Sequence, residues 1–373
     1  MVEALIEAVE GDAKRYVHFG VTSSDIIDTG NALMFKEALD VLEDDLIALI
    51  EVLTSWAERT KDLVCVGRTH GQHAVPTTYG MKFAVWVAEL LRHTERLDEL
   101  RARLLVGKVS GAVGTMAGMD KLGVEIQGRV LKRLGLGEPL VTNQVVQRDR
   151  YAELFFFLAL LASTLDKIAK EIRNLQRTEI GEVMEPFRAG QAGSSTMPHK
   201  RNPHRSERIC SLARYLRSLV SVALENIPLE HERDLTNSAN ERLILFDGLM
   251  LANYMLRELK SILEGLTINN IAVERNLHLL RGVNMAERVM LELVKRGVDR
   301  VTAYKLVQSA SFRAIEKGMS LAESIQLEPK ILEVLSPEEI EDLCNPKTYI
   351  GAARTIVDNV VTYAKNVLGK RIQ

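Results

Sequence analysis

The chain is poor in cysteine. Only Cys65, Cys210 and Cys344 occur among its 373 residues, far apart and without the spacing of a metal site. A disulfide framework or a cysteine-based zinc site would need more cysteines at closer intervals. We therefore expect reduced thiols in a cytosolic protein, with no disulfide.

Long apolar runs and a strong charge bias are also missing. No stretch approaches the roughly 20 apolar residues that cross a bilayer, and the N-terminus has no secretory pattern. The formal net charge is only -2, from 48 basic and 50 acidic residues. A nucleic-acid binder would normally carry a basic excess. The composition therefore predicts a cytoplasmic globular protein without a membrane or nucleic-acid partner.

Strand patterns are scarce, the best being residues 63–67, whereas helical periodicity is strong. Further long helices are predicted over 79–106 and 205–225. Three apolar seams with alternating three- and four-residue steps run through Leu39, Leu42, Leu46, Leu49, Leu53 and Trp56, through Leu154, Leu158, Leu161, Leu165, Ile168, Ile172 and Leu175, and through Leu245, Leu249, Ala252, Leu256, Leu259 and Leu263. The sequence therefore predicts an all-α fold built on long packed helices.

We expect three domains: a remnant of an N-terminal domain over 1–27, a central long-helix bundle over 28–266, and a smaller helical domain over 267–373. Turns at Gly282, Gly297, Gly318 and Pro337 separate the shorter helices expected in the domain over 267–373. Residues 2–9 look like the middle of an amphipathic helix without a cap, so the natural start is expected to lie further upstream. Helices this long favour a bundle shared across a homo-oligomer; a monomeric bundle is the alternative.

The loop over residues 193–203, Gly-Ser-Ser-Thr-Met-Pro-His-Lys-Arg-Asn-Pro, combines hydroxyls, a lysine and an asparagine. Lys200 and Asn202 are donors for a carboxylate or a developing oxyanion, and Ser194 or Ser195 could exchange a proton or attack a carbonyl. An ordinary surface loop is the plainer alternative. The position between two long apolar segments favours a catalytic role.

A second polar cluster, residues 67–78, holds Thr69, His70 and His73 in a short turn bounded by glycine and proline. Histidine exchanges protons near neutral pH, so His70 is a candidate general acid and His73 a weaker one. Inert surface histidines are the alternative.

Two further clusters lie at predicted helix starts. The run Thr22-Ser23-Ser24-Asp25 could cap the following helix or, through Thr22 and Ser23, bind phosphate or carboxylate oxygens. Within residues 142–150, Gln144 and Arg148 could hold a polar substrate, whereas Asp149 and Arg150 could merely balance helix-end charge.

The last cluster, residues 230–242, opens the third seam. Ser238 and Glu241 have the spacing of a capping box, which is a structural alternative. Arg233 and Arg242 bracket that position, and guanidinium groups grip phosphate or carboxylate at two points. An anion site at the helix start accommodates both features.

The loop and the four other polar clusters together resemble the fumarase/aspartase superfamily, whose signature loop Gly-Ser-Ser-x-Met-Pro-x-Lys-x-Asn is complete over residues 193–202. The stretches 16–25, 67–73, 197–203 and 232–234 resemble the adenylosuccinate lyases in particular. The resemblance spans nearly the whole chain.

The resemblance implies β-elimination of fumarate from adenylosuccinate, giving AMP, and from succinyl-aminoimidazole-carboxamide ribotide. It implies Ser194 as the base, His70 as the acid, and Lys200 with Asn202 as stabilisers of an aci-carboxylate intermediate. It also implies a homotetramer with shared sites, no metal or cofactor, and an upstream segment with a second active-site histidine. Binding roles fall to Thr22, Ser23, Thr69, Gln144, Arg208, Arg233, Ser238 and Arg242, with Ser238 and Arg242 on the phosphate.

Rival functions stay open at this point. Another lyase of the superfamily or the related cycloisomerase shares the loop, although the arginines of residues 230–242 favour a phosphorylated substrate. A serine hydrolase is disfavoured because the sequence lacks the Gly-x-Ser-x-Gly elbow and alternating strands. An inactive, truncated helical assembly is the third alternative.

Overall fold

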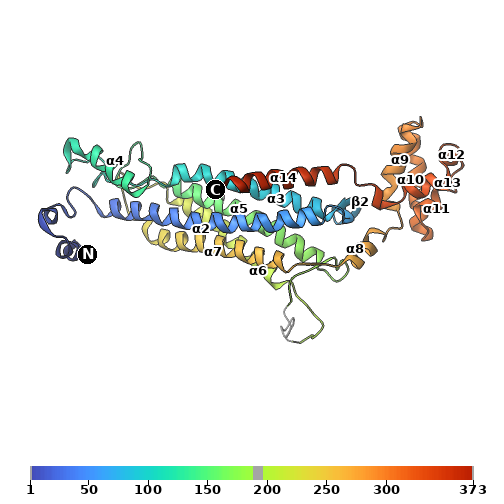
Figure 1. The fold of residues 1–373 in the computed structure, drawn as a ribbon, viewed down its shortest axis with the longest axis horizontal. Coiled ribbons are helices and arrows are strands. Elements are labelled where there is room, and N and C mark those ends of the chain that lie inside the picture. The colour runs from blue at the N-terminus through green and yellow to red at the C-terminus, as the bar shows by residue number, and fades with distance from the viewer. Residues whose placement is uncertain (1, 188–195, 372–373) are drawn as a thin grey trace. The chain divides into compact units, whose positions relative to one another are not determined.

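The computed structural model describes residues 2–187 and 196–371, and the described chain is dominated by helices (Figure 1). The α-helices are α1 (Val2–Ala8), α2 (Ser23–Arg59), α3 (Tyr79–Leu104), α4 (Gly123–Leu134), α5 (Asp149–Leu175), α6 (His204–Glu225), α7 (Ser238–Glu264), α8 (Asn270–Leu277), α9 (Ala286–Lys295), α10 (Arg300–Lys317), α11 (Leu321–Ile325), α12 (Pro329–Leu332), α13 (Pro337–Leu343) and α14 (Ala353–Arg371). Short 3-10 turns are η1 (Gly11–Tyr16), η2 (Asp120–Leu122), η3 (Val283–Met285) and η4 (Pro346–Thr348).

The described strands form two antiparallel pairs, β1 (Val64–Thr69) with β2 (Gln72–Thr78), and β3 (Val183–Met184) with β4 (Thr267–Ile268). The all-α prediction is confirmed, as are the helices expected over 79–106 and 205–225 and the strand expected near 63–67. Sequence analysis missed β2 and α4.

The chain divides into two compact units, each assembled from three stretches. Unit 1 comprises Met1–Leu49, Glu89–Ala169 and Arg205–Ser261, and unit 2 comprises Ile50–Ala88, Lys170–His204 and Ile262–Gln373. Helices α2, α3, α5 and α7 are therefore divided between the units, and α6 contributes its first residue, His204, to unit 2. The predicted limits at 27 and 266 stay predictions.

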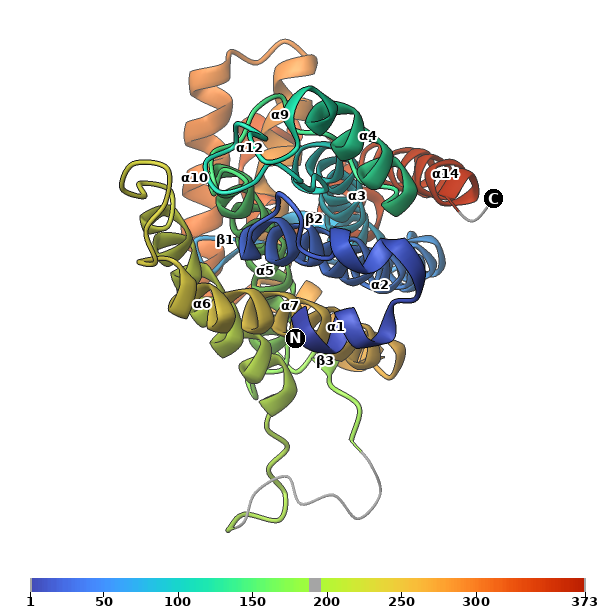
Figure 2. The ribbon, with the colours of Figure 1, turned by 90° about the vertical axis from the view of Figure 1, so that its left-hand side faces the viewer.

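In unit 1 the three apolar seams face the interior, as predicted. Every seam residue of this unit is at most 9% exposed: Leu39, Leu42, Leu46, Leu49, Leu154, Leu158, Leu161, Leu165, Ile168, Leu245, Leu249, Ala252, Leu256 and Leu259. A Cβ on Gly248 of α7 would lie 2.8 Å from the Phe155 ring, so glycine permits α7 to approach α5 closely. Figures 1 and 2 show α2, α5 and α7 running side by side in this unit.

Polar contacts also join the helices of unit 1. Asn253 of α7 donates to Asp45 of α2 at 2.6 Å, and Arg217 of α6 contacts Asp166 of α5 at 3.0 Å. Between α3 and α5, the Nε2 atom of His93 lies 2.9 Å from the Thr164 hydroxyl. These contacts fix the register of helices whose apolar seams alone would permit sliding.

His93 is 3% exposed, and its Nδ1 atom has no hydrogen-bond partner. Burial, reinforced by the positive charge of Arg96, lowers the pKa of His93 from 6.5 to about 4. The imidazole therefore stays neutral in the folded protein at pH values where the unfolded chain already binds a proton.

The stability of the protein is accordingly expected to fall as the pH is lowered from about 6.5 to about 4. Over that interval the unfolded state binds more protons at this site, and the difference between the two pKa values corresponds to about 3 kcal/mol. His93→Gln should remove this contribution to the dependence of the unfolding free energy on pH. Urea unfolding at several pH values measures it, and equal slopes for both proteins would contradict the assignment.

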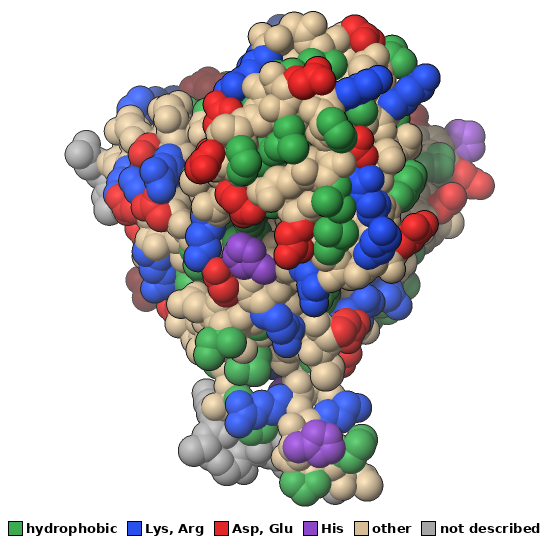
Figure 3. Space-filling model, turned by 90° about the vertical axis from the view of Figure 1, so that its right-hand side faces the viewer, with side chains coloured by type: hydrophobic (Ala, Val, Ile, Leu, Met, Phe, Trp, Pro, Cys, Tyr) green, Lys and Arg blue, Asp and Glu red, His purple; other side chains and the backbone are tan. Residues whose placement is uncertain are grey.

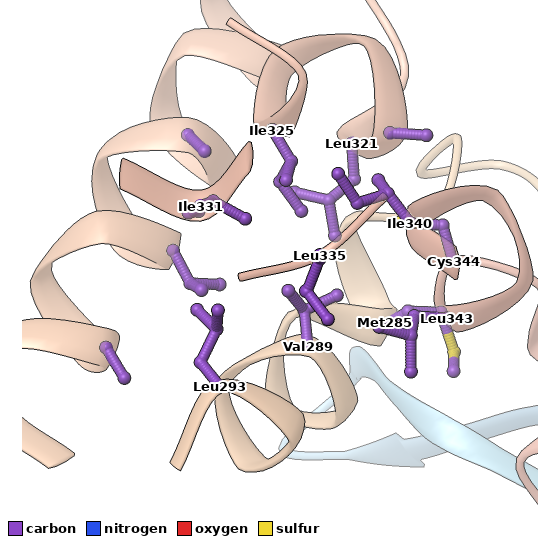
Figure 4. Close-up of a cluster of buried hydrophobic side chains, with 14 residues drawn as sticks. Met285, Val289, Leu293, Leu321, Ile325, Ile331, Leu335, Ile340, Leu343 and Cys344 are labelled. Carbon is purple, nitrogen blue, oxygen red and sulfur yellow. The ribbon is translucent and has the colours of Figure 1, made fainter. Parts of the chain in front are cut away.

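Unit 2 has its own apolar core among the C-terminal helices. Met285, Val289 and Leu293 on η3 and α9 pack with buried residues of α10 to α13, among them Leu321, Ile325, Leu335 and Ile340 (Figure 4). The predicted turns are confirmed, because Gly282, Gly297 and Gly318 have left-handed backbones and Pro337 begins α13. Helix α14 pairs with the end of α2 through Lys365–Glu58 and with the residues after α2 through Asp358–Lys61.

The surface shown in Figure 3 carries basic and acidic side chains interspersed with apolar ones, rather than a stripe of one sign. None of the helices in the described ranges combines the length and apolarity needed to cross a bilayer. Burial raises the thiol pKa of both Cys65 and Cys344 to about 12, so these thiols stay protonated.

Candidate active site

The β1–β2 hairpin of unit 2 presents Thr69 and His70. Thr69 pairs with Gln72, and the two residues between them, His70 and Gly71, have φ values of 54° and 75°. Two left-handed residues make the tight turn that matches the twist of a hairpin. A histidine in this conformation is uncommon, and here it leaves the His70 side chain exposed at the tip.

A buried carboxylate is bonded to the β1 strand of this hairpin. Glu182, with a fully buried side chain, pairs with Arg68 and accepts hydrogen bonds from Tyr79 at 2.7 Å and Asn276 at 2.8 Å. Burial raises the pKa of Glu182, but the hydrogen bonds from Arg68, Tyr79 and Asn276 outweigh it and the net pKa is lowered. Burial and Arg68 lower the pKa of His73, which is therefore neutral near pH 7.

Replacing Glu182 by glutamine is expected to destabilise the protein by about 3 kcal/mol or more, because the Arg68 charge then lies largely buried without its counterion. Glu171→Gln is the matched control, since Glu171 pairs with Lys82 at 2.9 Å but is 34% exposed. Its cost should stay below about 1 kcal/mol. Urea unfolding measures both, and equal costs would refute the supporting role of Glu182.

Ser194 lies outside the described residues, together with the neighbouring glycines of the signature loop. The end of that loop is described in unit 2: the Lys200 backbone N–H donates to the Met197 carbonyl at 3.1 Å, and Gln176 donates to the Arg201 carbonyl at 3.0 Å. The Lys200 side chain is exposed. Asn202 lies two residues before the start of α6.

In unit 1 the Thr-Ser-Ser-Asp run begins α2, and its Asp25 side chain bonds back to the start of the helix. The Asp25 carboxylate accepts from the backbone N–H groups of Thr22 at 2.7 Å and Ser110 at 2.8 Å, and it pairs with buried Lys108. Arg233 donates to the Ser24 hydroxyl at 2.6 Å. The first turn of α2 is thereby tied to the segment that precedes α7.

A cavity of about 310 Å³ opens beside this junction, within the usual range for small-ligand sites. It is lined by Ile27, Asn31, Met34, Arg148, Arg233, Ser238, Glu241, Arg242, Leu245 and Phe246. The structure thus brings together three predicted binding residues, Arg233, Ser238 and Arg242. Two guanidinium groups and the N-terminus of α7 make this wall suited to an anion.

The capping box, the structural alternative for Ser238 and Glu241, is not the role of the Glu241 carboxylate. Helix α7 begins at Ser238 itself, and the Glu241 carboxylate accepts from Arg148 at 2.7 Å and from the Asn237 side chain at 2.8 Å. Glu241 is therefore committed to a buried ion pair, which leaves the Ser238 hydroxyl on the cavity wall.

The other predicted binding residues lie at different places. In unit 1, Gln144 donates to the Ala112 carbonyl at 2.9 Å and its backbone N–H contacts the Glu232 carbonyl at 3.4 Å, next to Arg233. Arg208 lies on α6 and donates to the Tyr254 hydroxyl of α7 at 2.8 Å, away from the cavity lining. Thr69, His70, Lys200 and Asn202 belong to unit 2.

Sequence analysis missed the apolar wall of the cavity and its residue Asn31. The available signal was the position of Ile27, Asn31 and Met34 on one face of α2, at helical spacing after the polar run. Across the described parts of the chain, no three His, Cys, Asp or Glu side chains are arranged to hold a metal ion. The groups gathered here are donors for an anion.

Comparison with known proteins agrees with this chemistry. A family model described as "Lyase" matches residues 1–216, and one described as "Adenylosuccinate lyase C-terminus" matches residues 282–360. Adenylosuccinate lyase of Methanocaldococcus jannaschii is 50% identical over 98% of this chain and 79% of its own length. That of Pyrococcus abyssi is 52% identical over 98% of this chain and 81% of its own.

Solved structures of two other enzymes have a similar fold. A fumarate lyase from a Mesorhizobium species has a TM-score of 0.89 and 32% identity, covering 97% of this chain and 81% of that one. A 3-carboxy-cis,cis-muconate lactonizing enzyme from Pseudomonas putida has a TM-score of 0.88 and 36% identity, covering 98% and 81%. Because about half of its residues are identical to those of the two adenylosuccinate lyases over 98% of its length, the chain belongs to the adenylosuccinate lyase family.

Proposed function

We propose that this chain is a carbon–nitrogen lyase that eliminates fumarate from adenylosuccinate, giving AMP, and from succinyl-aminoimidazole-carboxamide ribotide. The observation that carries the proposal is the unit 1 cavity, where Arg233, Ser238 and Arg242 converge at the N-terminus of α7. A phosphate group matches two guanidinium forks and a helix N-terminus. A phosphate has more acceptor oxygens and more negative charge than one carboxylate of free aspartate or malate, so it uses these donors more fully.

In the proposed reaction the Ser194 alkoxide removes a proton from the carbon beside a carboxylate. The electron pair left on that carbon forms the new double bond as the carbon–nitrogen bond breaks, and His70 gives a proton to the departing nitrogen. After the proton is removed and before the carbon–nitrogen bond breaks, the carboxylate next to the deprotonated carbon carries a second negative charge. Lys200 and Asn202 are the donors assigned to that charge, because preorganised donors lower the barrier where charge develops.

A serine hydroxyl is a weak base at its ordinary pKa, so the reaction requires a dry site with excess positive charge. In the proposed reaction Lys200 supplies part of that charge. The remaining proposed binding residues, Thr22, Ser23, Thr69, Gln144 and Arg208, supply donors for the carboxylates and the ribose. The chemistry uses proton transfer and charge stabilisation from side chains of this chain alone.

The direct test is to incubate the purified protein with adenylosuccinate and to measure fumarate and AMP. The proposal predicts equal amounts of the two products. No turnover of either succinylated substrate would refute it, and lactonisation of a carboxymuconate instead would favour the cycloisomerase alternative suggested by the Pseudomonas structure.

We further propose that the protein acts as a homotetramer whose sites combine residues of several copies. In unit 1 an apolar row on α2 is exposed at seven-residue intervals: Ile27 is 52% exposed, Met34 43% and Val41 54%. An exposed apolar row of this kind supports the proposal that these helices pack across subunits. Leu243, Phe246 and Met250 form a second exposed row on α7.

Val41→Asp is expected to dissociate the assembly and to abolish most activity, because it places a charge on the proposed seam. Val301→Asp is the matched control, since Val301 is 62% exposed on α10 and belongs to neither row. Analytical ultracentrifugation measures the mass of both variants. A tetramer that survives Val41→Asp unchanged would argue against this interface.

A further inference from the structure

Arg148 lines the unit 1 cavity, yet all of its hydrogen-bond donors are already used. A guanidinium group has five N–H donors. From Arg148, Nε and Nη2 donate to the Glu241 carboxylate at 2.7 and 3.2 Å, and Nη1 and Nη2 donate to the Asp28 carboxylate at 3.0 Å each. The fifth bond runs from Nη1 to the Val146 carbonyl at 2.7 Å. No N–H of Arg148 remains for a ligand.

The whole cluster is buried. Arg148 is 3% exposed, Asp28 1% and Glu241 7%. The guanidinium carbon lies 4.6 Å from the centre of the Tyr151 ring, which closes one face of the group. Burial lowers the pKa of Arg148, but the bonds to Asp28 and Glu241 outweigh it and raise the pKa overall. Arg148 is therefore a permanently charged clamp between two carboxylates.

The two carboxylates belong to α2 and α7, each of which carries proposed binding residues at its start. Asp28 lies in the second turn of α2, five residues after Ser23, and Glu241 lies in the first turn of α7, between Ser238 and Arg242. Val146, just before α5, also donates its N–H to Asp28 at 2.8 Å. Fixing Glu241 against Asp28 thus fixes the start of α7 against the start of α2.

We propose that Arg148 is a positioning residue that sets the Ser238 and Arg242 donors at the separation a phosphate group requires. This inference rests on the proposed function, in which those donors bind the substrate phosphate. Lysine cannot replace the guanidinium fork, because a single ammonium group has three donors and cannot engage both oxygens of two carboxylates at once. Arg148→Lys therefore keeps the buried charge and loses the geometry.

The test uses the full chain and measures the dissociation constants of AMP and adenosine by calorimetry. Arg148→Lys is expected to weaken AMP binding about 10- to 100-fold, as displaced supporting residues do, while adenosine binding changes less than about twofold. Arg101→Lys is the matched control: Arg101 of α3 also bridges two carboxylates of α2, Asp40 at 2.7 Å and Glu43 at 2.9 Å, and none of the three lines the cavity. It should change neither constant.

A second variant guards against a simple folding defect. The triple change Arg148→Met, Asp28→Asn and Glu241→Gln removes all three charges, so no unpaired charge is buried, and it should show the same selective loss of AMP binding. Unchanged AMP binding in Arg148→Lys, or equal losses for AMP and adenosine, would overturn the positioning role. If the unaltered protein binds AMP no better than adenosine, the phosphate assignment itself falls, and that result is read before any variant is made.

Discussion

Replacing His70 by asparagine is expected to lower kcat by about 10²- to 10⁴-fold, the usual contribution of a general acid. Asparagine is the informative substitution because it tolerates the left-handed backbone that His70 adopts, with φ of 54°. The hairpin should therefore keep its turn while the proton donor is lost. Alanine at this position would add backbone strain to the chemical effect.

His73→Asn is the control for this experiment. His73 lies on the same hairpin, but burial and Arg68 lower its pKa, so it is a poor proton donor at neutral pH. Its replacement is expected to change kcat by less than about tenfold, in keeping with a group outside the proton transfer. Equal losses in the two variants would remove His70 from its proposed role.

The His70 variant also tests whether sites are shared. Subunits carrying His70→Asn can be mixed with subunits carrying Ser194→Ala by unfolding and refolding them together. If each site takes these residues from different copies, some sites in the mixed assemblies contain both intact groups, and activity returns. Activity that stays at the level of the separate variants would contradict shared sites, while the loss in each variant alone would still stand.

Much of the fold could be predicted because apolar periodicity is a local property. The seam through Leu154, Leu158 and Leu161 needed only the sequence of one helix, and all three residues are buried. Strand β2 was missed because Pro76 and the polar residues around it give little strand signal. The hairpin forms because β1 pairs with it across the His70–Gly71 turn, with Pro76 opposite Val66.

The candidate site was predictable in its residue types and not in its supporting contacts. Arg233 and Arg242 could be assigned to an anion because they flank one helix start. Asp28, Arg148 and Glu241 are separated by more than ninety residues at each step. The sequence made Arg148 a candidate for a polar substrate and Glu241 part of a capping-box pattern, and nothing in it linked either residue to Asp28. Only the fold reveals that one guanidinium group holds both carboxylates.

The second large effect is expected at Lys200. Methionine has a similar length and lacks the charge, so Lys200→Met removes one donor from the proposed aci-carboxylate while the apolar part of the side chain is kept. Loss of one preorganised donor lowers kcat by about 10²- to 10³-fold. KM should change less than about threefold, because the additional negative charge develops only on the way to the intermediate.

Lys61→Met is the matched control for Lys200. Lys61 also belongs to unit 2 and forms a surface pair with Asp358 at 2.8 Å. Neither residue has a role in the proposed reaction. Its replacement should leave kcat and KM unchanged, because exposed pairs contribute little to stability. A comparable loss in both variants would indicate a general effect of removing a lysine.

In the proposed mechanism, fixed positive and amide groups of the signature loop stabilise a carbanion that a serine oxygen could not otherwise form. The most direct measurement is kcat of Lys200→Met with adenylosuccinate, made on protein whose mass and helicity match those of the unaltered chain. The account predicts a fall of about 10²- to 10³-fold with KM nearly constant. An unchanged kcat in that material would contradict it.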